Sequence, residues 1–187
     1  MKKLLILAVA IVMLTAQFTA CGPIASILGD AIDNSSDTPQ TVATRSGDLT
    51  MEFPGSWTNL VLNEVAAVQM GFALKEQYMI VIEESAEDFD EDFTIDEYAQ
   101  IIAGNMLVSV ESAETTPIAD VTIGSEIAAK QFEITGSVNK IKVKYVITCA
   151  IYNNTYYQFT AWSLQSKYGE AKSVFDTILQ SVSAKSI

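Results

Sequence analysis

The feature that most limits how this chain can fold is a long alternating segment, 140–152, followed by an aromatic one, 155–164. In the first segment, apolar side chains recur at every second position and so line one face of a β-strand: Ile141, Val143, Tyr145, Ile147, Cys149 and Ile151. Between the segments, Asn153-Asn154 tolerates the left-handed backbone of a tight turn. We therefore predict an antiparallel hairpin. Because two-residue and three-residue turns place different aromatic residues opposite Cys149, both registers remain open.

Shorter strand patterns surround this hairpin. We predict strands over 49–53, 66–74, 77–83, 121–123 and 126–135, and a loop over 112–117. Pro54-Gly55 ends the first of these strands because neither residue sustains a strand ladder. The continuous apolar run 78–82 indicates a strand covered on both faces. Gly124-Ser125 suits the turn of a second hairpin.

Two helices complete the pattern. Thr94 and Glu97 have the spacing of a capping box, and apolar residues recur at helical spacing behind them as far as Met106. A second amphipathic stripe follows Tyr168 and extends to Val182. Strands joined by hairpins and interrupted by helices predict an α+β domain in which an antiparallel β-sheet is flanked by helices.

The N-terminus has the composition of a secretory signal peptide over residues 1–20. Two lysines precede an apolar run, 4–14. Eleven residues rise only about 16 Å as a helix, roughly half of a bilayer core, so the run is too short to span a membrane. We therefore expect export from the cytoplasm.

The segment that ends this signal, Phe18-Thr19-Ala20-Cys21-Gly22, resembles a lipobox, although Phe18 stands where leucine is usual. In that motif a lipid is joined to the cysteine sulfur, so we expect Cys21 to anchor the protein to the bacterial cell membrane on its extracytoplasmic side. The alternative is plain secretion with a free Cys21. Residues 21–47 are polar enough to form a flexible tether. The globular domain is expected to cover 48–187.

Charge and composition exclude several functions. The chain has a net charge of −12, and after removal of the signal nine basic and 23 acidic side chains remain, a net charge of −14. Such a charge opposes binding to nucleic acid. The sequence contains no histidine, which removes Ser-His-Asp and Cys-His catalysis. We therefore predict that the protein is not an enzyme, and we expect no cofactor apart from the lipid on Cys21.

Three groups of residues are candidates for a site. Asp88, Asp90 and Asp92 imitate the start of a calcium loop, but Phe93 stands where that loop needs glycine, so a solvated loop or a surface for a basic protein competes with this weak metal hypothesis. The aromatic residues Trp57, Tyr156 and Trp162 could form a binding patch, although aromatic residues on strands commonly pack in a core. Cys149, on the apolar face of its strand, is expected to be a buried structural thiol.

The order of these motifs resembles PsbP-like domains. The likeness rests on Phe53-Pro54-Gly55-Ser56-Trp57, the acidic segment 83–92 before a helix, the hairpin around Asn153, the strand with Ala161-Trp162-Ser163, and the closing helix. It covers roughly 48–182 and implies an α/β/α sandwich around an antiparallel sheet. The family implies protein-binding or assembly roles and offers no catalytic residue to transfer.

We therefore predict a membrane-anchored, extracytoplasmic lipoprotein that acts as a non-enzymatic protein-binding or assembly module, with a protein or cell-envelope partner. A lipoprotein that binds a small ligand or a cation is the second hypothesis. A hydrolase that uses a pair of carboxylates is the third.

Overall fold

The computed structural model describes residues 38–185. The predicted signal peptide 1–20, Cys21 and most of the predicted tether lie outside the described residues. Within the described part, no helix is long and apolar enough to cross a membrane.

The described chain forms two α-helices, two short 3-10 helices and eleven β-strands, all paired antiparallel. The helices are η1 (Ala73–Lys75), η2 (Ala86–Asp88), α2 (Ile95–Ser109) and α3 (Tyr168–Gln180). The strands are β1 (Gln40–Ala43), β2 (Leu49–Phe53), β3 (Thr58–Asn59), β4 (Val68–Phe72), β5 (Gln77–Ser85), β6 (Glu111–Thr115), β7 (Ala119–Ile123), β8 (Ile127–Val138), β9 (Ile141–Tyr152), β10 (Thr155–Leu164) and β11 (Ser183–Ala184). This is the α+β class expected from the sequence.

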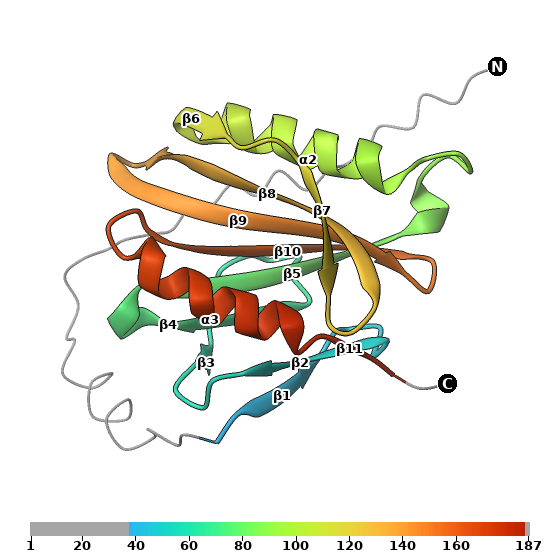
Figure 1. Ribbon diagram of the computed structural model, residues 1–187, viewed down its shortest axis with the longest axis horizontal. Helices are drawn as coiled ribbons and strands as arrows, with labels where there is room; N and C mark the ends of the chain where they lie inside the picture. The colour runs from blue at the N-terminus through green and yellow to red at the C-terminus, as the bar shows by residue number, and fades with distance from the viewer. Residues whose placement is uncertain (1–37, 186–187) are drawn as a thin grey trace.

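The strands form one large sheet and one small sheet. The large sheet has the order β3-β4-β5-β10-β9-β8-β6, with β7 also paired to β8, and the small sheet has the order β1-β2-β11. Helix α2 covers one face of the large sheet, and α3 with the small sheet covers the other (Figure 1). The large sheet is therefore the middle layer of a sandwich.

A separate apolar core lies on each side of the large sheet, because its central strands carry apolar side chains on both faces. In β5, Met79 and Val81 belong to the core under α3, whereas Ile80 and Ile82 belong to the core under α2. The prediction from the run 78–82 is confirmed. Two covered faces give the central strands the near-continuous burial that their sequences indicate.

The structure settles the register of the long hairpin. Asn153 and Asn154 have φ values of 46° and 60°, and Thr155 pairs with Tyr152, so the turn has two residues. Both are in the left-handed region that this type of turn requires. With this register Gln158 lies opposite Cys149, so the expectation of an aromatic residue at that position is wrong for the two-residue turn.

Helix α2 begins as its sequence predicts. The Thr94 hydroxyl accepts a hydrogen bond from the Glu97 N–H at 3.2 Å, and the Thr94 N–H donates to the Glu97 carboxylate at 2.8 Å. This reciprocal pair satisfies two N–H groups that have no partner inside a helix. The capping box therefore sets the position at which α2 starts above the sheet.

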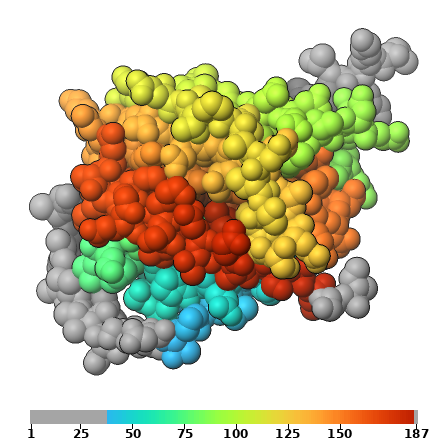
Figure 2. Space-filling view, in the orientation of Figure 1, coloured from blue at the N-terminus to red at the C-terminus, as the bar shows by residue number. Residues whose placement is uncertain are grey.

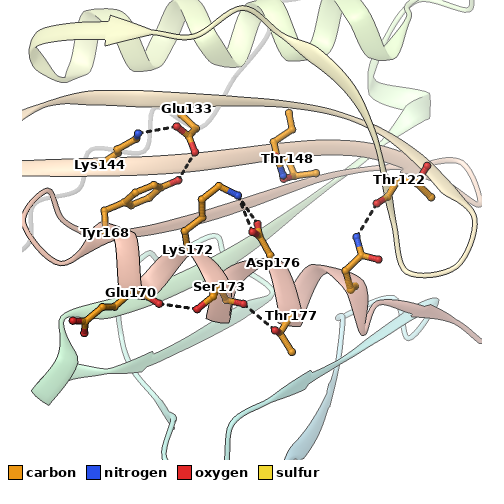
Figure 3. A network of polar contacts seen from close by, with 12 residues as sticks. Thr122, Glu133, Lys144, Thr148, Tyr168, Glu170, Lys172, Ser173, Asp176 and Thr177 are labelled. Carbon is orange, nitrogen blue, oxygen red and sulfur yellow. Dashed lines mark hydrogen bonds and ion pairs between the residues drawn. The ribbon is translucent and has the colours of Figure 1, made fainter.

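A polar network joins α3 to the large sheet (Figure 3). The Glu133 carboxylate accepts a hydrogen bond from the Tyr168 hydroxyl at 2.8 Å and pairs with the Lys144 ammonium at 2.8 Å. The same ammonium lies 4.7 Å from the centre of the Tyr168 ring. Burial acts against the charged form of Glu133, but Lys144 and Tyr168 outweigh it and lower the pKa of this carboxyl. The N-terminal end of α3 is thus held on strands β8 and β9.

The β7–β8 hairpin is fixed to the C-terminal end of α3. The Gly124 N–H donates to the Leu179 carbonyl at 2.9 Å, and the Gln180 side-chain amide donates to the Thr122 carbonyl at 3.1 Å. In the space-filling view, the hairpin and the end of the helix meet over this contact (Figure 2). Gly124 has a φ of 57°, which favours glycine.

Two sequence expectations are wrong. The sequence pattern places residues 40–43 in the tether, but they form β1 and pair with β2, so the folded domain begins before residue 48. Residues 112–117 were expected to be a loop, but most of them belong to the edge strand β6. Each strand is short and exposes alternate or most side chains, and β6 also contains an irregularity in its pairing between Glu111 and Glu114. Neither strand carries a strong apolar alternation.

Candidate functional site

The predicted aromatic patch is not a surface. Trp57, Tyr156 and Trp162 are 2%, 2% and 6% exposed, and they belong to the cores on opposite sides of the large sheet. Trp57 packs against Phe53 and Phe175 under α3. The sheet therefore separates Trp57 from Tyr156 and Trp162, and aromatic character alone does not distinguish core packing from a binding groove.

The acidic segment does not form the metal site considered from the sequence. Within the described residues, no group of three or more acidic, cysteine or histidine side chains is placed to hold a metal ion, so Asp88, Asp90 and Asp92 do not converge. All three side chains are exposed to solvent. In the described part of the chain these three carboxylates are therefore not arranged as a metal site, and the weak metal hypothesis gains no support.

An aromatic cluster holds the acidic segment against the domain. The rings of Phe89 and Phe93 stack at 4.7 Å, and Phe89 also contacts Tyr156 at 4.9 Å. The Tyr98 hydroxyl donates to the Glu84 carboxylate at 2.5 Å, and burial together with this carboxylate raises the pKa of Tyr98. The acidic segment is thus attached to the start of α2 by packing, and it leaves Asp88, Asp90 and Asp92 exposed to water.

Cys149 is fully buried in the core under α2, as expected from its position on β9. Burial, followed by the nearby Glu84 carboxylate, raises the pKa of this thiol. A raised pKa suppresses the reactive thiolate, so Cys149 has the environment of a structural residue.

The described surface contains an open groove of about 600 Å³ beyond the N-terminal end of α2. It is lined by Ile95 at the start of the helix, residues 120–122 and 126–130 of the β7–β8 hairpin, and residues 151–152 at the end of β9. Its volume is within the range of ordinary ligand pockets. We call it the Lys130 groove.

The floor of the Lys130 groove is a part of the large sheet that α2 does not cover. Because side chains alternate along a strand, Ala128, Lys130 and Ile151 point to the same face as Cys149, whose cross-strand partner is Lys130. Ile151 is 41% exposed, unlike Cys149 two residues earlier. Because the Ala128 side chain is small, the sheet surface next to Ile151 is recessed. The result is a shallow apolar floor where the helix stops.

Lys130 divides this floor from the covered part of the sheet. Its ammonium lies 2.6 Å from the Asp96 carboxylate on α2 and 2.7 Å from the Asp120 carboxylate on β7. These two partners, Asp120 first, raise the pKa of Lys130, which therefore stays charged at neutral pH. Lys130 is held by α2 on one side and by β7 on the other. Its side chain is only 18% exposed, whereas the Asp120 side chain is 86% exposed.

The sequence contained only a faint signal for this groove. Ile151 continues the apolar alternation of 141–149, so its parity predicts burial. Nothing in its neighbours shows that α2 starts too late to cover it. The available signal is Lys130, the single basic residue of the predicted strand 126–135, because a lysine in a partly buried strand needs carboxylate partners from neighbouring elements.

Comparison with solved structures places this architecture among known folds. The chain is similar to the solution structure of cyanobacterial PsbP (CyanoP) from Synechocystis sp. PCC 6803, with a TM-score of 0.61 and 11% identity over 90% of this chain and 99% of that one. The domain has a PsbP-like fold.

Two further PsbP-like structures are similar over most of their length. LpqN of Mycobacterium tuberculosis, described as involved in cell envelope biogenesis, has a TM-score of 0.59 and 14% identity over 88% of this chain and 100% of that one. The Ran-binding protein Mog1p of Saccharomyces cerevisiae has a TM-score of 0.55 and 8% identity over 80% and 96%. No protein-family model and no curated protein matches the sequence. At these identities the likeness concerns the fold.

Proposed function

We propose that this protein is a lipid-anchored, extracytoplasmic binding module of PsbP-like fold, without catalytic activity, that recruits a protein partner of the cell envelope through the Lys130 groove. The lipobox-like segment around Cys21 supports the anchor and the location. Proteins described as Ran-binding and as involved in cell envelope biogenesis share the fold, which supports a binding role.

The observation that carries the proposal is the uncovered apolar floor at Ile151. A large apolar side chain that is 41% exposed, directly after the buried residues 145–150 of β9, keeps apolar area in contact with water. Covering such area stabilises an association by about 25 cal/mol per Å² before the entropy cost of binding. The polar rim around an apolar centre is the usual anatomy of a protein interface.

Site-specific photo-crosslinking in the native cells tests this proposal. A photo-reactive amino acid replaces Ala128, which is exposed in the groove, and a matched variant carries it at Ser173, which is exposed on the outer side of α3. We expect a discrete crosslinked protein from position 128 and none of that mass from position 173. Adding Ile151→Ser to the first variant should remove the adduct.

The crosslinking result can also refute the proposal. The same adducts from both positions, or an adduct at 128 that persists with Ile151→Ser, would mean that the groove is not a specific contact. An Ile151→Ser protein that retains the wild-type thermal midpoint shows that a lost adduct reflects lost binding. We expect the thermal midpoint to be retained because Ile151 is partly exposed, so only part of its side chain contributes to the core.

A small ligand is the second candidate, since the groove volume fits one. In that case position 128 gives no protein adduct, and the purified protein gains thermal stability with an extract of small molecules from the same cells. Ile151→Ser should then remove the thermal shift.

A further inference from the structure

The charges around the Lys130 groove are strongly unbalanced. Of the lining residues, all within the described part of the chain, Asp120 and Glu126 are acidic and Lys130 is the single basic one. Asp96 adds a third carboxylate through its ion pair with Lys130. The one positive charge is therefore outnumbered three to one.

The surroundings do not correct this imbalance. No lysine or arginine occurs in the sequence between Lys75 and Lys130, a stretch that includes all of α2 and the acidic segment. The aromatic cluster holds that acidic segment beside the start of α2. The groove thus lies beside a stretch of chain whose only charges are negative, and this excess of negative charge attracts cationic groups and repels anionic ones.

The two carboxylates that pair with Lys130 can still accept a hydrogen bond from a second cationic group. Lys130 is held at 2.6 Å and 2.7 Å between Asp96 and Asp120, yet each carboxylate has two oxygens, and the ion pairs occupy one oxygen of each. Asp120 is 86% exposed, so a second cation can reach it without displacing Lys130. Glu126, on the adjoining turn, is also exposed.

We propose that the Lys130 groove binds a cationic segment of a protein partner, in which lysine or arginine side chains pair with Asp120 and Glu126 and a neighbouring apolar side chain covers Ile151 and Ala128. This rests on the proposed function and adds the chemistry of the partner. Electrostatic attraction of this kind accelerates encounter and selects against anionic partners, including anionic lipid surfaces.

Methyl NMR spectroscopy of the full-length protein in phosphatidylcholine nanodiscs tests the proposal with defined peptides. The probes are acetylated, amidated pentapeptides: Lys-Leu-Lys-Leu-Lys, the charge-reversed Glu-Leu-Glu-Leu-Glu, and Lys-Ser-Lys-Ser-Lys, which lacks apolar side chains. We expect the first to shift the methyl signals of Ile151 and Ile95. The other two should bind at least roughly tenfold more weakly, because each lacks one of the two contacts.

Two double variants with equal loss of charge separate the groove from the overall field of an acidic protein. Asp120→Asn with Glu126→Gln removes two carboxylates of the groove. Glu114→Gln with Glu170→Gln removes two exposed carboxylates, on β6 and α3. We expect the first pair to weaken Lys-Leu-Lys-Leu-Lys binding roughly tenfold and the second to change it less than about twofold.

Equal weakening by both double variants would overturn the proposal, as would equal binding of the charge-reversed peptide, shifts confined to methyl groups outside the groove, or no binding at all. These failures differ from failure of the proposed function. A crosslinked partner from position 128 without peptide binding refutes the cationic chemistry and keeps the binding role. Peptide binding without any crosslinked protein refutes the protein partner.

Discussion

Gly124 is where a single methyl group should do the most damage to the groove wall. It forms the turn of the β7–β8 hairpin, whose strands line the Lys130 groove, and it lies against the C-terminal segment. A Cβ atom added at Gly124 would lie 2.0 Å from the Val182 carbonyl oxygen. We therefore predict that Gly124→Ala separates the hairpin from the end of α3.

The expected cost has two parts. With a φ of 57°, an alanine costs about 1–2 kcal/mol more than glycine, and the stiffer unfolded chain offsets about 0.5 kcal/mol of that. Movement of Val182 also breaks the 2.9 Å hydrogen bond from Gly124 to Leu179, which adds about 1–3 kcal/mol if the buried groups stay unpaired. The sum is a loss of about 3 kcal/mol, or roughly 10 °C in melting temperature for a domain of this size.

Gly47→Ala provides the control. Gly47 also has a positive φ, 78°, but no atom lies within 4 Å of the added Cβ. It should therefore show only the backbone part, about 1 kcal/mol. Urea unfolding followed by the fluorescence of the buried Trp57 and Trp162 measures both variants. If Gly124→Ala is no less stable than Gly47→Ala, the packing of the hairpin against the C-terminal segment is wrong.

Three further predictions concern other parts of the fold. Thr94→Ala should lower the free energy of unfolding by about 1 kcal/mol while Thr94→Ser stays near wild type, and equal urea midpoints for the two would contradict the capping box. Glu133 has a pKa below its ordinary 4.5, so its contribution to stability is present at neutral pH and is lost as the pH falls through the lowered pKa. The difference in unfolding free energy between wild type and Glu133→Gln should therefore shrink below about pH 4.5. A constant difference would refute the role of Lys144 and Tyr168. Cys149 should react with a thiol reagent only as fast as the domain unfolds, measured by mass spectrometry of its peptide, whereas rapid native labelling would contradict its burial.

The parts of the fold that the sequence predicts are those fixed by local chemistry. Asn153-Asn154 specifies a turn through its tolerance of positive φ, and Thr94 with Glu97 specifies a helix start through two hydrogen bonds. The run 78–82 predicts two covered faces because consecutive side chains of a strand point to opposite faces, and both faces must be covered to bury them. In each case the cause lies within a few residues of the effect.

The parts that the sequence does not predict depend on how distant elements meet. Strand β1 has little apolar alternation and exists because β2 pairs with it, and the separation of Trp57 from Trp162 depends on which face of the sheet each reaches. The Lys130 groove arises because α2 starts at Ile95 and leaves Ile151 uncovered. No local pattern carries that information.

Cysteine labelling of spheroplasts tests the central claim most directly. Ala128→Cys places a thiol on the groove floor and keeps Ile151, and Ser173→Cys places one on α3 as a control, with the buried Cys149 as a silent background. A membrane-impermeant maleimide should label both positions in spheroplasts, but residue 128 more slowly than in the purified protein, because a partner covers the groove. Equal rates at residue 128 in the two preparations, or labelling only after lysis, would contradict an extracytoplasmic module that binds its partner in the Lys130 groove.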